Sequence, residues 1–161
     1  MMSELPDVDT AAVDRFWSDV IAAGSVPAGA RYVDADCFGD SVELADELLS
    51  LILHGPKRAT AACVAEHEAV DAPLPQVGDL FVATDGSGQP CAVIRTTDVR
   101  VGPLSSVDDR FAWDEGEGDR SRAYWLEAHT ACFTRAYDRL GLDFHPDIPV
   151  VFERFELVHP V

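Results

Sequence analysis

Two short segments of the chain contain residue types that could carry chemistry. The first is residues 55–60, Gly-Pro-Lys-Arg-Ala-Thr, which places Lys57 and Thr60 three positions apart. A lysine in a cleft can stay charged and stabilise a developing oxyanion, or lose its charge by desolvation and activate a hydroxyl nucleophile. A solvated surface lysine is the alternative without a function. The segment is not a P-loop. That motif, G-x-x-x-x-G-K-[ST], lies between a strand and a helix, whereas Lys57 follows a predicted helix and leads into a predicted strand.

The second segment is residues 111–119, Phe-Ala-Trp-Asp-Glu-Gly-Glu-Gly-Asp, followed by Ser121 and Trp125. Its glycines allow sharp backbone turns and close approach of a ligand. A carboxylate of Glu115 or Glu117 could move protons or pair with Lys57. The alternative is an acidic loop that favours the positive N-terminus of the helix that follows. We expect no metal here, because no histidine or second carboxylate cluster has a supporting spacing.

Hydrophobic periodicity predicts the elements that must position these residues. A helix over residues 10–23 is capped by Thr10 or Asp9, and a second begins at Asp40, in a capping-box spacing with Glu43, and ends at a left-handed Gly55. Residues 105–118 read mostly as loop. A third helix, capped by Asp119, runs to about residue 140. The predicted strands are residues 59–65, 79–84, 91–101 and 150–158, of which the second and third form a hairpin.

This order of elements predicts an α+β fold with a mixed, largely antiparallel sheet or small barrel. Within it, Lys57 lies just beyond a helix end and leads into a strand. In a regular strand Lys57 and Thr60 would face opposite sides, so they converge only if the segment turns or bulges first.

Composition excludes several classes of function. The 161 residues favour one domain, and the 12 basic and 29 acidic residues give a net charge of −17. Such a charge opposes a broad phosphate-tracking surface and an anionic membrane, so we expect no DNA and no membrane partner. It leaves room for one local cationic pocket. Of the basic residues 11 are arginine, and Lys57 is the only lysine.

The four cysteines form no C-x-x-C pair, so we expect buried reduced thiols rather than a zinc or redox site. The first residues are acidic and lack the apolar core of a signal peptide, and no apolar run approaches a membrane span. We therefore expect a cytoplasmic protein.

Three further side chains are weaker candidates. His129 follows Trp125 by four positions and shares its helix face, where a packed or surface histidine is the preferred interpretation. Trp113 and Trp125 could stack on a base, although Trp125 also fits the core stripe. Arg95 lies in an apolar strand and could reach a cleft, or expose its guanidinium at an edge.

These motifs resemble the ASCH domain family, whose fold is a PUA-like β-barrel flanked by helices. The G-x-K-x-x-T signature is weak alone and becomes fairly specific with the Glu-Gly-Glu-Gly-Asp loop downstream. The resemblance covers about residues 35–158 and is strongest to a bacterial branch with an extra N-terminal helix. It implies that residues 1–34 are a helical extension packed on an ASCH domain of residues 35–161. The matching segments are residues 38–41, 44–48, 55–60, 75–79 and 111–125.

The resemblance implies binding of RNA, a nucleotide or a modified nucleoside in a cleft around Lys57, without a cofactor. Relatives include hydrolases of the amide in N4-acetylcytidine, which use a Lys, Thr and Glu constellation, and reported ribonucleases. When this constellation is matched to the present sequence, the resemblance implies that Lys57, Thr60 and Glu115 are the catalytic residues. Glu117 replaces Glu115 if the acidic loop aligns differently with that of the family. The Thr60 hydroxyl would attack an amide carbonyl, Lys57 would activate it or hold the oxyanion, and Glu115 would move protons. The expected ligand contacts are Arg58, Arg95, Glu117, Ser121 and Trp125.

Three alternatives stay open beside the amide hydrolase. One is a binding module for RNA or a nucleotide without catalysis, and another is a ribonuclease of single-stranded RNA, which lacks a well-placed histidine pair. The third is a structural protein that binds another protein. The charge of −17 favours a small ligand over a polymer, unless Lys57, Arg58, Arg95 and Arg122 build a cationic cleft.

Overall fold

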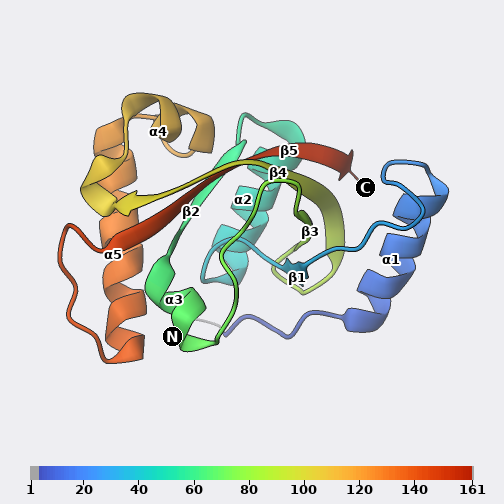
Figure 1. Cartoon of the computed structure of the whole chain (residues 1–161), viewed down its shortest axis with the longest axis horizontal. Coiled ribbons are helices and arrows are strands. Elements are labelled where there is room, and N and C mark those ends of the chain that lie inside the picture. Colours follow the sequence, from blue (N-terminus) through green and yellow to red (C-terminus); the bar gives the residue numbers. More distant parts are fainter. Residues whose placement is uncertain (1–3, 161) are drawn as a thin grey trace. The chain divides into compact units, whose positions relative to one another are not determined.

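The computed structural model describes residues 4–160, and its secondary structure is mixed α+β, as predicted (Figure 1). A five-stranded sheet has the strand order β1-β3-β4-β5-β2. β1 pairs with β3 in parallel, whereas β3 with β4 and β2 with β5 pair antiparallel, which confirms the predicted hairpin and the mixed sheet. The strands are β1 (Asp34–Asp36), β2 (Ala59–Cys63), β3 (Leu80–Thr84), β4 (Pro90–Pro103) and β5 (Pro149–Pro160).

The chain divides into two compact units, each with its own core. Unit 1 comprises the described residues up to Gly55, then Gly78–Thr96 and residues 155–160; unit 2 comprises Pro56–Val77 and Thr97–Arg154. Among the described residues, no helix has the length and apolarity needed to cross a membrane. The helices of unit 1 are α1 (Thr10–Ala22) and α2 (Val42–His54); those of unit 2 are α3 (Val64–Ala69), α4 (Asp109–Glu115), α5 (Arg122–Leu140) and a 3-10 turn (Leu104–Ser106).

Helix α2 ends at Gly55 as predicted, but it differs from the prediction in its N-cap residue and in the backbone conformation of Gly55. The N-cap is Ser41, whose hydroxyl accepts from the Leu44 amide, and not Asp40. Gly55 has an extended backbone with φ −125°, so it is not a left-handed cap. A side chain at this position would be tightly placed, because a Cβ there would lie 3.0 Å from the Leu51 carbonyl oxygen.

Unit 2 contains two short helices that periodicity did not predict. α3 follows β2 directly, and α4 occupies seven residues of the expected loop. α4 forms because Asp108 caps it by accepting from the Phe111 amide and because Phe111 and Ala112 are buried. A helix this short gives too few turns for a periodic signal. α4 ends at Gly116, which adopts a left-handed φ of 70°.

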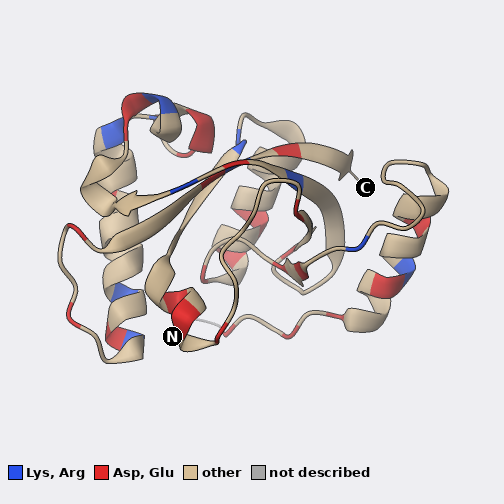
Figure 2. Cartoon of the chain, in the orientation of Figure 1, with Lys and Arg blue, Asp and Glu red and all other residues tan. Residues whose placement is uncertain are grey.

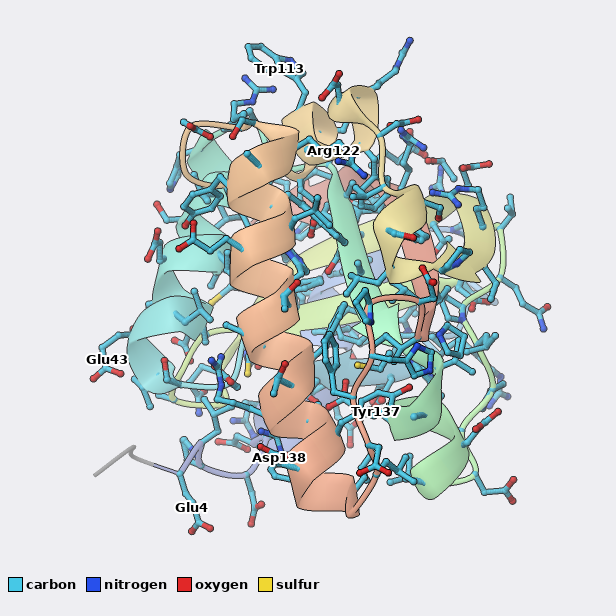
Figure 3. The ribbon with its side chains drawn as sticks, turned by 90° about the vertical axis from the view of Figure 1, so that its left-hand side faces the viewer. Glu4, Glu43, Trp113, Arg122, Tyr137 and Asp138 are labelled. Carbon is cyan, nitrogen blue, oxygen red and sulfur yellow. The ribbon has the colours of Figure 1, made fainter. Side chains whose placement is uncertain are left out.

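Helix α5 packs its apolar face into the core of unit 2. Its N-cap is Ser121, whose hydroxyl accepts from the Tyr124 amide, and not Asp119. In Figure 3, Tyr137 and Asp138 point in different directions from α5, and only Tyr137 is buried. The core that α5 helps to form includes Phe111, Phe152 and Ile148.

We predict that Ser121→Ala lowers the free energy of unfolding by about 1 kcal/mol, because α5 loses the side-chain acceptor of its first turn. Ser121→Asp keeps an acceptor there and should retain most of the stability. Urea unfolding of both variants measures the difference. Equal losses in the two variants would show that the cap hydrogen bond is not what Ser121 contributes.

Candidate functional site

Lys57 is the centre of a buried polar cluster in unit 2. Its side chain is 1% exposed, although it lies only two residues before β2. The ammonium donates to the Ala59 carbonyl oxygen at 2.8 Å, to Glu117 Oε1 at 2.7 Å and to Glu115 Oε1 at 3.3 Å. An ammonium has three N–H donors, so this set of acceptors uses all of them.

The end of α4 brings the two carboxylates to the lysine. Glu115 is the last residue of α4, and the left-handed Gly116 turns the chain so that Glu117 follows on the same side. Gly116 is packed against the lysine segment, since a Cβ there would lie 2.9 Å from Pro56 Cγ and 3.0 Å from the Lys57 amide nitrogen. The contact of Arg58 N–H with the Asp114 carbonyl, at 2.8 Å, fixes the same two segments together.

The second oxygen of Glu115 faces α5. Its Oε2 accepts a hydrogen bond from the Trp125 indole nitrogen and lies 3.1 Å from His129 Nε2. The imidazole is stacked on the Trp125 ring, with centroids 3.9 Å apart and an interplanar angle of 11°. Glu115 is 1% exposed, so both of its oxygens are engaged inside the protein.

The contacts of His129 determine how many protons the cluster holds. Its Nδ1 lies 2.9 Å from the Trp125 carbonyl oxygen, which can only accept, so Nδ1 carries a proton. Nε2 faces the Glu115 carboxylate, so that contact also requires a proton, bound to the imidazole or to the carboxylate. The Glu115–His129 pair therefore holds one proton more than a carboxylate and a neutral imidazole.

The charges of the cluster oppose the effects of burial on each pKa. Burial lowers the pKa of Lys57, but the charges of Glu115 and Glu117 outweigh it and hold the pKa above its usual value. Burial likewise lowers the pKa of His129, and the charge of Glu115 outweighs it, so that pKa is raised. For Glu115, burial raises the pKa, but the charges of His129 and then Lys57 together outweigh burial, so the pKa is lowered.

These contacts favour a charged lysine. A neutral amine would leave two buried or half-buried carboxylates without their shared counter-ion. Lys57 is therefore placed to stabilise negative charge and to donate hydrogen bonds, rather than to accept a proton from a nucleophile. Among the described residues, no group of three or more His, Cys, Asp or Glu side chains could hold a metal ion.

The structure brings some of the predicted residues into this cluster and leaves others outside it. Lys57, Glu115, Glu117 and Trp125 are in mutual contact, as given above. Thr60 is half-buried in β2, and its amide belongs to the same peptide unit as the Ala59 carbonyl that Lys57 binds. The Thr60 hydroxyl makes none of the contacts of the cluster.

The remaining predicted ligand contacts have structural partners. Arg58 donates through Nη1 to the Lys57 carbonyl oxygen at 2.6 Å. Ser121 caps α5, and Arg95 lies in unit 1, where its guanidinium pairs with Glu156 at 2.7 Å. Trp125 is 2% exposed and has His129 and Phe152 stacked beside it. Its contribution to the site is therefore the indole N–H rather than an open ring face.

His129 is the member of the cluster that sequence reasoning ranked low. Its spacing of four from Trp125 did place both on one helix face, which is the signal that could have found it. What the spacing could not show is that a buried carboxylate from α4 faces the same point. Trp113, by contrast, is 56% exposed, projects outward in Figure 3 and carries the Arg120 guanidinium 3.7 Å from its ring centroid.

Comparison with known proteins identifies the class of this fold and site. The sequence model of the ASCH domain matches residues 34–159. The crystal structure of an ASCH domain from Lactobacillus crispatus JV V101 is 34% identical, with a TM-score of 0.76, covering 88% of this chain and 93% of that one. A crystal structure of a protein from Enterococcus faecalis V583 is 31% identical, with a TM-score of 0.83, covering 92% and 89%. No curated protein matched the sequence.

The chain therefore belongs to the ASCH domain family, a family associated with RNA binding. The PUA-like α+β fold class inferred from the sequence is confirmed. The division into a helical extension of residues 1–34 and an ASCH domain of residues 35–161 stays a prediction.

We predict that the stability contributed by His129 depends on pH. Because its pKa is raised in the folded state, this stability is present below the ordinary value of 6.5 and is lost as the pH rises through the folded value. The pKa of Glu115 is lowered, so its share is present above 4.5 and is lost as the pH falls through its folded value. His129→Gln should cost about 3 kcal/mol at mildly acidic pH and less at alkaline pH.

Urea unfolding of the wild type and His129→Gln between about pH 5 and pH 9 measures this difference. His54→Gln is the matched control, because His54 is an exposed histidine at the end of α2. A cost of His129→Gln that stays constant or grows toward alkaline pH would contradict the proton count.

Proposed function

We propose that this ASCH domain binds a modified nucleoside at Lys57 and hydrolyses an amide of the N4-acylcytidine type. The observation that carries the proposal is the buried ammonium of Lys57, held by Glu115 and Glu117 within unit 2. A fixed positive charge in a water-poor site is what an amide carbonyl needs when it becomes an oxyanion. The net charge of −17 supports a small ligand over a long RNA, because few phosphates could be neutralised.

Thr60 is the nucleophile in this proposal. The ammonium of Lys57 is bonded to the Ala59 carbonyl, so the main chain of Thr60 begins beside the positive charge. The Thr60 oxygen forms a bond to the amide carbon, and the electron pair of the C=O bond moves to the oxygen that Lys57 binds. Collapse of this intermediate breaks the bond to N4 and leaves an acyl ester on Thr60, which water then hydrolyses to a carboxylate.

The two carboxylates have different roles in this mechanism. Glu115 is enclosed and bound by Lys57, Trp125 and His129, so it positions the lysine and keeps it charged. Glu117 is 18% exposed and binds Lys57 alone among the residues given above. Once released from the lysine, its carboxylate takes the proton of Thr60 and returns it to N4 of the leaving cytidine.

A binding module without catalysis is the second candidate. It is favoured by the saturated hydrogen bonds of Lys57 and by the Thr60 hydroxyl, which lies outside the contacts of the cluster. A module of this kind would retain a nucleotide or nucleoside at Lys57 and release no product. Ribonuclease activity has less support, because His129 is engaged with Glu115 and Trp125 and is 12% exposed.

We predict that the protein releases cytidine from N4-acetylcytidine and that Thr60→Val lowers kcat at least about 100-fold, because the nucleophile is lost at nearly constant volume. Chromatography of the products measures the reaction. Thr97→Val is the matched control, since Thr97 is an exposed strand threonine of unit 2. No cytidine from a folded wild type would overturn the hydrolase and favour the binding module.

A further inference from the structure

The three acceptors of Lys57 differ in how easily they can be exchanged. The Ala59 carbonyl belongs to the backbone of β2, and Glu115 is 1% exposed and engaged through both oxygens. Glu117 is 18% exposed, and its Oε1 lies 2.7 Å from the ammonium. A ligand that comes from solvent and binds Lys57 must therefore take the position of the Glu117 oxygen.

A rotation of the Glu117 side chain is the smallest movement that frees the ammonium of Lys57, and close contacts surround the backbone on both sides of Glu117. Gly116 is packed against Pro56 and the Lys57 backbone, as described above. Gly118, with φ 57°, is packed against the Tyr124 ring, which an added Cβ would overlap. Both glycines thus lie against neighbouring groups, and rotation about the three side-chain torsions of Glu117 would turn its carboxylate away from the lysine.

The charge that Glu117 leaves behind defines the ligand group. Without its carboxylate, the contacts described here are those of Lys57, Glu115 and His129, and the Glu115–His129 pair holds the extra proton deduced above. Lys57 then contributes a positive charge that the pair does not cancel. A single negative charge on oxygen restores neutrality, whereas a neutral oxygen does not.

We propose that the Glu117 carboxylate occupies the binding position of a singly charged oxyanion of the ligand, a carboxylate or a phosphodiester, and competes with it for Lys57. This inference rests on the proposed binding of a ligand at Lys57 but not on catalysis. A carboxylate is the group that amide hydrolysis releases, and a phosphodiester is the group that a nucleotide chain offers. Both have the geometry to accept from the ammonium at the distance that Glu117 does.

Titration with two small monoanions tests the competition. Sodium acetate represents the carboxylate and sodium dimethyl phosphate the phosphodiester, at constant ionic strength, with neutral acetamide as the control ligand. The shifts of the Gly116 and Gly118 amide signals in NMR spectra report binding. In Glu117→Gln the charged competitor is gone, so at least one anion should bind about tenfold more tightly than in the wild type, and neutral acetamide should gain less than that anion does.

Glu127→Gln is the matched control, because it removes one negative charge from an exposed position of α5 in unit 2. It should bind the anions as the wild type does. Glu117→Ala provides a second variant without the competitor, so a folding defect of one variant does not leave the question open. The inference is overturned if neither Glu117 variant binds either anion more tightly than Glu127→Gln does.

The two proposals can fail separately. Tighter anion binding without release of cytidine from N4-acetylcytidine would remove the hydrolase and keep the competition at Lys57. Release of cytidine without tighter anion binding would keep the hydrolase and remove the competition. Preference for acetate over dimethyl phosphate identifies a carboxylate position, and the reverse preference identifies a phosphate position.

Discussion

A single buried ammonium determines the arrangement of unit 2. Moving the charge of Lys57 out of water costs several kcal/mol, and only partners that are themselves fixed can offset that cost. The β2 backbone, the end of α4 and the loop after Gly116 each supply one acceptor. Trp125 and His129 of α5 then hold the second oxygen of the Glu115 carboxylate, which Lys57 does not contact. The cluster thus joins elements that are far apart in the sequence.

The balance of charge at this site differs from that of the chain as a whole. Acidic segments outnumber basic ones along the chain, as Figure 2 shows, and the net charge is −17. The cluster has no such excess, because the charge of the lysine and the extra proton of the Glu115–His129 pair balance the two carboxylates. A protein that repels polyanions over most of its surface can therefore still accept a single negative or developing charge at one point.

Much of the fold and of the candidate site could be predicted from the sequence, and the predictions that were wrong have physical causes. The long periodic segments predicted the main helices and strands. The acidic segment with Glu115 and Glu117 predicted the carboxylates that contact Lys57. α3 and α4 are too short to show a periodic pattern. The N-caps of α2 and α5 are Ser41 and Ser121, one and two residues after the predicted aspartates, and both residue types cap helices well, so the sequence alone does not choose between them. The role of His129 depends on α4 and α5 meeting, which no local pattern encodes.

The most direct test of the account is the charge state of Lys57 itself. Because the chain contains one lysine, labelling with 15N-lysine gives a single side-chain nitrogen signal. We predict a slowly exchanging ammonium signal that persists above the pH at which free lysine side chains deprotonate, and that loses this protection in Glu115→Gln. A neutral amine near neutral pH, or a signal that exchanges as fast as that of free lysine, would contradict the buried ammonium.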